Sequence, residues 1–121
     1  MSASYGHQFY VIDGDWVSTQ IVMSHEDKSH AQMEYHAPIS HCWLSDKISP
    51  IYDKDGDVDV VKHGCAVDTK RTIVYDSPLP HVTRFAWRTD LKPNFEIPIY
   101  LHCEVRSSQK TGYWGEVVHL D

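Results

Sequence analysis

The stretch that decides the fold is "IPIYLHCEVRSS", residues 97–108, in which apolar and polar side chains alternate. One face of this segment is apolar and carries Ile97, Ile99, Leu101, Cys103 and Val105. The opposite face carries Tyr100, His102, Glu104 and Arg106. A period of two residues is that of a β-strand with one buried face. Cys103 therefore points toward a core, as a small apolar side chain or as half of a disulfide.

Short runs rich in β-branched and aromatic residues recur along the rest of the chain. They cover residues 8–12, 16–23, 31–44, 58–62, 71–75, 83–89 and 113–119. Turn sequences such as "DGD" and "DSPLP" separate them, and no run has the apolar spacing of an amphipathic helix. Short strands with turns about every ten residues predict one antiparallel β-sandwich domain over residues 1–121.

The phases of the strands give further predictions. Residues 8–23 are expected to form a hairpin. In the run 31–44, Ile39 and Trp43 alternate toward the core, which leaves Cys42 out of phase with them. Either a β-bulge or departure of the strand from the sheet would account for this position of Cys42.

Charge and composition exclude several classes of protein. The chain has 17 acidic and 11 basic residues, a net charge of −6, which disfavours nucleic acid or an anionic membrane as partner. It has no run of about 18 apolar residues, so no segment is expected to span a membrane. The N-terminal "MSASYGHQFY" lacks the basic and apolar regions of a secretory signal.

The cysteines are odd in number: Cys42, Cys65 and Cys103. Cys42 and Cys103 both border apolar strands, so a disulfide between two sheets is plausible. It would close a loop of about sixty residues and stabilise the fold by about 4 kcal/mol. Spacing alone does not select this pairing over the other two, and free thiols would suit a cytosolic protein.

Three segments around the cysteines are distinctive: "HCWLS" at 41–45, "HGCAVD" at 63–68 and "RFAWRTDLKPNFEIPIYLHCEVR" at 84–106. In sequence and spacing they resemble the C-terminal half of the zona pellucida (ZP) domain. Ala66 replaces a proline that is common in the family. The resemblance covers residues 41–106 and implies an immunoglobulin-like sandwich from an extracellular protein, acting as a non-enzymatic module.

The resemblance also implies which cysteines pair. The family joins the first and third cysteines of this half, which are Cys42 and Cys103 here. Family members usually carry another cysteine shortly after the third, where this chain has Ser107 and Ser108. Cys65 is therefore expected to be unpaired.

The role that the resemblance implies is structural: assembly of filaments, matrix or coats with other ZP-domain chains. The alternative is a co-receptor module that binds a secreted ligand. The basic cleavage site and hydrophobic segment of polymerising members are not found, and the N-terminal ZP half does not fit before Cys42. We therefore expect a lone subdomain that does not polymerise by itself.

Metal and enzyme chemistry are weaker interpretations. "DKDGDVD" at 53–59 resembles the start of an EF-hand loop, but Val58 and Gly64 occupy the positions of its glycine and glutamate. The histidines at 25, 30, 36 and 41 match no tight zinc motif with Glu26 or Cys42. Cys65 with His63 or His102 as base would be a nucleophile without an orienting group. We therefore predict no catalytic residue, metal or cofactor, and a cytosolic Cys/His enzyme or metal protein remains the second alternative.

The tryptophans offer a candidate contact surface. Trp43 and Trp87 lie in apolar runs and are expected in the core. Trp16, Tyr113 and Trp114 flank turns, where packing of terminal strands is the favoured interpretation and a protein-contact patch the alternative.

Overall fold

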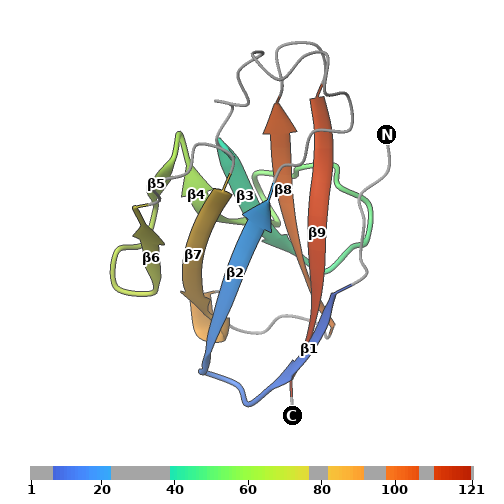
Figure 1. Ribbon diagram of the computed structural model, residues 1–121. Helices are drawn as coiled ribbons and strands as arrows, with labels where there is room; N and C mark the ends of the chain where they lie inside the picture. The colour runs from blue at the N-terminus through green and yellow to red at the C-terminus, as the bar shows by residue number, and fades with distance from the viewer. Residues whose placement is uncertain (1–6, 23–38, 77–81, 92–97, 107–110, 121) are drawn as a thin grey trace.

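The computed structural model describes residues 7–22, 39–76, 82–91, 98–106 and 111–120, which form two sheets packed face to face (Figure 1). The strands are β1 (Gln8–Val11), β2 (Trp16–Val22), β3 (His41–Ser45), β4 (Val58–Lys62), β5 (Cys65–Ala66), β6 (Thr72–Tyr75), β7 (Val82–Arg88), β8 (Ile99–Arg106) and β9 (Thr111–Leu120). A short 3-10 helix, η2 (Thr89–Leu91), follows β7. Eight of these strands match predicted runs, with ends that differ by at most two residues within the described ranges, and only the short β5 was not predicted.

The strand order defines the fold class. A large sheet of six strands has the order β1-β9-β8-β3-β4-β5, and a small sheet of three has the order β2-β7-β6. β1 runs parallel to β9, whereas the other neighbours are antiparallel. This is the arrangement of a variable-type immunoglobulin sandwich. The prediction of an immunoglobulin-like β-sandwich is confirmed.

The predicted hairpin over residues 8–23 is wrong. A turn does form at Gly14 (φ 93°), closed by a hydrogen bond of 3.0 Å from the Asp15 N–H to the Ile12 carbonyl. However, β1 joins the large sheet and β2 the small sheet, so the chain changes sheet at this turn. The apolar faces of both strands still reach the same core, from opposite sides. Each strand therefore buries its apolar face in the common core, although the two strands do not pair with each other.

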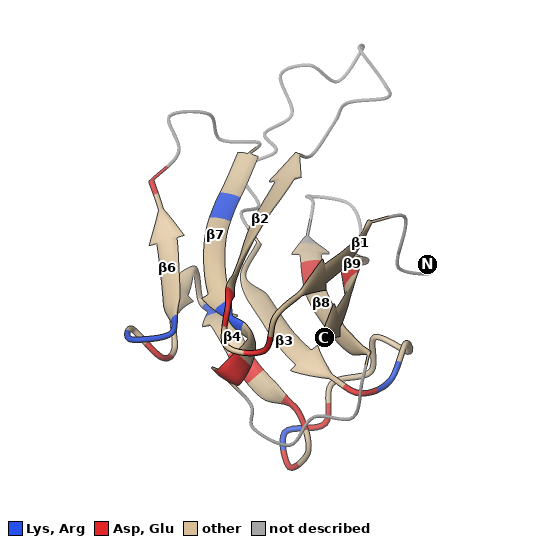
Figure 2. Ribbon diagram, turned by 90° about the horizontal axis from the view of Figure 1, so that it is seen from below, with Lys and Arg blue, Asp and Glu red and all other residues tan. Residues whose placement is uncertain are grey.

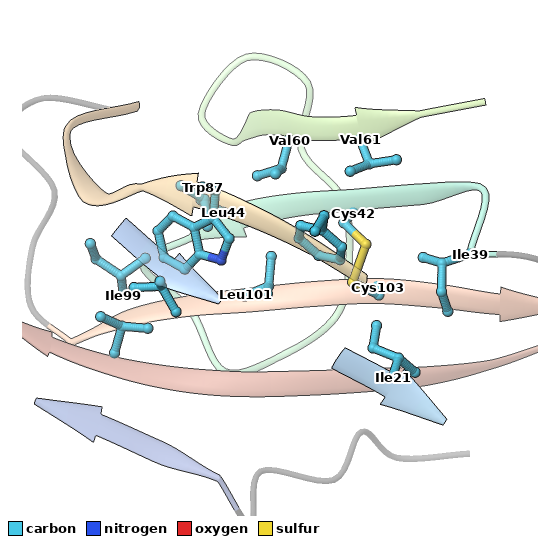
Figure 3. Close-up of a cluster of buried hydrophobic side chains, with 13 residues drawn as sticks. Ile21, Ile39, Cys42, Leu44, Val60, Val61, Trp87, Ile99, Leu101 and Cys103 are labelled. Carbon is cyan, nitrogen blue, oxygen red and sulfur yellow. A yellow bond between two sulfur atoms is a disulfide. The ribbon is translucent and has the colours of Figure 1, made fainter. Parts of the chain in front are cut away.

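The core lies between the two sheets (Figure 3). Its fully buried members are Val17, Ile21, Ile39, Cys42, Leu44, Val60, Val61, Phe85, Trp87, Ile99, Leu101, Cys103 and Val118. The alternation of the opening stretch is confirmed from Ile99 to Cys103, and Ile97 lies outside the described residues. Phe85 and Trp87 share the inward face of β7, as predicted.

Two residues of β3, Cys42 and Trp43, point to the opposite faces from those predicted. Cys42 and Leu44 face the core, whereas Trp43 lies on the outer face of the large sheet. Ile39 precedes β3, so strand alternation does not fix its direction relative to Cys42. The register against β4 does shift between Cys42 and Trp43, and the extra residue is Val60 on β4. The bulge therefore belongs to β4 rather than to the run that contains Cys42.

Candidate functional site: an exposed face of the small sheet

Cys42 and Cys103 form a disulfide in the centre of the large sheet. They are direct neighbours across β3 and β8, with Cα atoms 4.1 Å apart. Directly opposite residues of the closely spaced kind in antiparallel pairs are about 4.5 Å apart. The bond therefore joins adjacent strands of one sheet, and the expectation of a bond between sheets is wrong. It also differs from the inter-sheet disulfide of antibody domains.

Cys65 is a free, exposed thiol in β5, at the edge of the large sheet. The two-residue turn before it, His63 (φ 54°) and Gly64 (φ 79°), has the left-handed conformations of a type I′ hairpin. His102 lies on β8, and β3 and β4 separate that strand from β5. The structure therefore does not bring His102 beside Cys65 as a base. Ser107 and Ser108 lie outside the described residues.

The acidic turn uses its carboxylates to hold its own backbone. One oxygen of Asp57 accepts a hydrogen bond from the Asp53 N–H at 2.8 Å, and Asp53 accepts one from the Asp55 N–H at 3.0 Å. The described part of the chain holds no group of three His, Cys, Asp or Glu side chains that could bind a metal ion. Of the zinc candidates, Cys42 is in the disulfide, and residues 25, 26, 30 and 36 lie outside the described ranges.

An aromatic cluster covers the outer face of the large sheet at β3. The Trp43 ring lies 5.4 Å from the Tyr52 ring and 5.6 Å from the His102 ring. The ring of His41 also packs on Trp43, and its Nε2 lies 2.7 Å from a carboxylate oxygen of Asp59. Burial disfavours the imidazolium of His102 and lowers its pKa. Trp43 itself is buried, so this cluster packs the segment after β3 onto the sheet and presents no open aromatic face.

Glu116 is a buried carboxyl group between the two sheets, and sequence analysis missed it. Its side chain is on the inward face of β9 and is 1 % exposed. The Thr19 hydroxyl of β2 donates to Glu116 Oε1 at 2.7 Å, and the Trp87 indole N–H donates to the Thr19 oxygen at 3.4 Å. Burial raises the pKa of Glu116 to about 7. The alternation of residues 113–119 could have revealed this inward position.

The three aromatic residues predicted as a contact surface do not lie together. Trp16 is exposed on the outer face of the small sheet, whereas Tyr113 lies opposite Glu104 on the outer face of the large sheet. Trp114 points inward and packs against the core, with its ring 6.4 Å from that of His7. The favoured interpretation, packing of terminal strands, is correct for Trp114.

Trp16 instead belongs to a different surface, the outer face of the small sheet. We define this small-sheet face by the outward residues Trp16, Ser18, Gln20, Val22, Ile73, Tyr75, Arg84, Ala86 and Arg88. In the register, Trp16 lies opposite Arg88, and Arg84 lies between Gln20 and Tyr75. Trp16 is 44 % exposed, and Ile73 and Tyr75 are exposed as well.

The charges on this face are positive. β2 and β6 contain no charged residue, and β7 contributes the arginines at 84 and 88 (Figure 2). The Arg84 guanidinium lies 5.6 Å from the centre of the Tyr75 ring, a cation–π contact. Tryptophan, tyrosine and arginine are the residue types that most often carry binding energy in protein interfaces. The face is thus suited to a protein partner.

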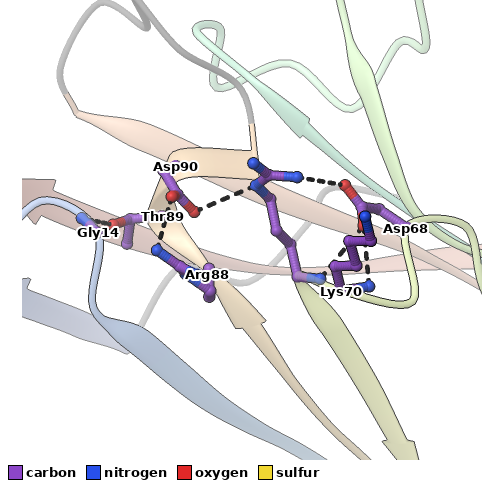
Figure 4. Close-up of polar contacts among 7 residues, drawn as sticks. Gly14, Asp68, Lys70, Arg88, Thr89 and Asp90 are labelled. Carbon is purple, nitrogen blue, oxygen red and sulfur yellow. Dashed lines mark hydrogen bonds and ion pairs between the residues drawn. The ribbon is translucent and has the colours of Figure 1, made fainter.

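A network of ion pairs lies at the Trp16 end of the small-sheet face (Figure 4). Asp90 of η2 accepts from Arg88 at 2.8 Å and lies 3.7 Å from Arg71. Arg71 also pairs with Asp68 at 3.1 Å. The backbone N–H of Lys70 donates to Asp68 Oδ1 at 3.0 Å, and this hydrogen bond lowers the pKa of the Asp68 carboxyl group. The network fixes Arg88 beside Trp16.

Comparisons with known proteins support the fold class and do not identify a family. The structure is similar to the second immunoglobulin domain of the mouse polymeric immunoglobulin receptor, with a TM-score of 0.53 over 95 % of each chain. The sequence identity is 12 %, so the likeness concerns the fold alone. No family model matches the sequence, and no curated protein matches it either.

Proposed function

We propose that this chain is an extracellular, non-enzymatic module of the ZP C-terminal type, with a structural role in assembling filaments, matrix or coats. The observation that carries the proposal is the cysteine arrangement. Cys42 pairs with Cys103 while Cys65 stays free, and this choice of partners is the one that the ZP resemblance implies. An immunoglobulin-like fold with a buried disulfide is typical of extracellular domains, and it weighs against the alternative of a cytosolic enzyme or metal protein.

The small-sheet face supports a role in protein contact. It combines exposed aromatic and aliphatic side chains with positively charged arginines. The partner is another ZP-domain chain in the structural role, and a secreted ligand in the alternative role of a co-receptor module. No helix in the described ranges is long and apolar enough to cross a membrane.

Because the subdomain is not expected to polymerise by itself, the test uses it within the longer ZP-domain protein that the resemblance implies, secreted from cultured cells. We expect assembled material, seen by electron microscopy, to be reduced when Trp16→Ala and Tyr75→Ala are combined, because both remove contact area from the small-sheet face. The matched control is Ile51→Ala, since Ile51 is exposed in the segment between β3 and β4 and not on this face. Unimpaired assembly of the double variant would count against this face. Binding of a soluble ligand without assembly would favour the co-receptor role.

A further inference from the structure

The outer edge of β2 is open to strand pairing. Within the described residues β2 pairs with β7 alone, so one edge of the strand carries backbone N–H and C=O groups without a strand partner. Its register with β7 is regular over all seven residues from Trp16 to Val22. An edge of this kind is a template for another extended chain.

Soluble β-proteins usually protect such edges, and the strand β2 itself carries no charge, proline or bulge that would protect it. Its sequence "WVSTQIV" contains no lysine or other charge, no proline and no glycine, and its pairing with β7 shows no bulge. Charges, prolines and bulges are the devices that prevent edge-to-edge association. Their absence here makes β2 suited to pairing with another strand.

We propose that β2 pairs antiparallel with β2 of a second copy of this chain, about a two-fold axis at Thr19. This inference rests on the edge of β2 and does not depend on the proposed function. The small sheets of two copies would then form one continuous sheet of six strands, in the order β6-β7-β2-β2-β7-β6, with the β2 edges at its centre. The two small-sheet faces would become one surface.

The sequence of β2 is self-complementary in this register. Directly opposite residues of an antiparallel pair point to the same side. Trp16 would then meet Val22 of the second copy on the outer face, an aromatic pair with a β-branched residue. Ser18 would meet Gln20 on the same face. The inward residues of β2 are Val17, Thr19 and Ile21, and all three are β-branched. Val17 would lie opposite Ile21 of the second copy, and Thr19 opposite Thr19.

Apolar exposure and charge both favour contact at this edge. Trp16 (44 % exposed) and Val22 (53 %) lie at the two ends of β2, and Ile12 (64 %) lies in the turn before it. Two copies with a net charge of −6 repel each other over most of their surfaces. β2 itself is uncharged, so contact between two β2 strands sets no like charges of this strand against each other. Because a strand edge is a small interface, the association is expected to be weak and concentration-dependent.

The experiment is sedimentation velocity on the full chain carrying Cys65→Ser, so that a disulfide between two Cys65 thiols is not counted. We expect dimer to increase with protein concentration and with salt, since salt screens the repulsion between the copies. In the variant Ser18→Lys/Gln20→Lys, each lysine lies opposite a lysine of the second copy. This variant should weaken dimerisation by about tenfold or more.

The matched control is Ser18→Lys/Gln20→Glu, in which each lysine lies opposite a glutamate. Its dimerisation should equal or exceed that of the parent, and both variants should unfold at the parent's temperature because Ser18 and Gln20 are exposed. A parent that stays monomeric up to about 1 mM would overturn the proposal. Equal dimerisation of the two variants would overturn it as well, because pairing centred on Thr19 sets lysine against lysine in one variant and lysine against glutamate in the other.

Discussion

Replacing Glu116 by glutamine should stabilise the protein above neutral pH. Glu116 is buried between the sheets, and its pKa is raised from 4.5 to about 7. A difference of 2.5 units between these two values corresponds to about 3 kcal/mol, at about 1.4 kcal/mol per unit. Glutamine keeps an oxygen that can accept the Thr19 hydrogen bond and carries no charge at any pH.

The sign of the pH dependence follows from proton binding. Between pH 4.5 and about 7 the folded protein holds a proton on Glu116 that the unfolded chain has released. The contribution of Glu116 to stability is therefore most favourable below pH 4.5, falls as the pH rises through this window, and reaches its full penalty above about pH 7. The Gln variant should lack this contribution, so its advantage over the parent should grow from near zero at low pH to about 3 kcal/mol at pH 8.

Urea unfolding of parent and Glu116→Gln at several pH values between 4.5 and 8 measures this difference. Asp55→Asn is the matched control, because it removes an equal charge from an exposed turn. The difference between the Asn variant and the parent should show no comparable growth with pH. A stability difference between Glu116→Gln and the parent that stays constant across the range would refute the reasoning.

Three further predictions concern stability. Cys103→Ala should cost about 4 kcal/mol of unfolding free energy, because the disulfide closes a loop of 61 residues; equal urea midpoints under oxidising conditions would argue against the bond. Thr89→Val should cost about 1 to 3 kcal/mol, since the Gly14 N–H donates to the Thr89 hydroxyl oxygen; an unchanged melting temperature would contradict this. Gly64→Ala should cost about 1 kcal/mol because the φ of Gly64 is 79°; a raised urea midpoint would show that this turn relaxes.

Much of the fold follows from local patterns in the sequence. Alternation located most of the strands, and it placed Leu101, Cys103 and Trp87 toward the core because a strand has only two faces. Pairing between strands is not a local property. The turn at Gly14 was recognised, but nothing near it tells whether β1 and β2 belong to one sheet or to two.

The candidate site shows the same division. Trp16 was selected from its position beside a turn, but Tyr75 and Arg84 join it only through the register of β2, β7 and β6. These residues are far apart in the sequence, so no motif connects them. Glu116 was missed because a carboxylate is an unusual core residue, although the alternation of β9 could have revealed its inward direction.

The central claim, an extracellular module of the ZP C-terminal type, depends most directly on the cysteines. The decisive measurement is disulfide mapping by mass spectrometry on unreduced protein whose free thiols have been blocked. The account predicts a linked peptide pair containing Cys42 and Cys103, together with a blocked Cys65. Three blocked thiols in protein made under oxidising conditions, or Cys65 bonded to either of the other two, would contradict it.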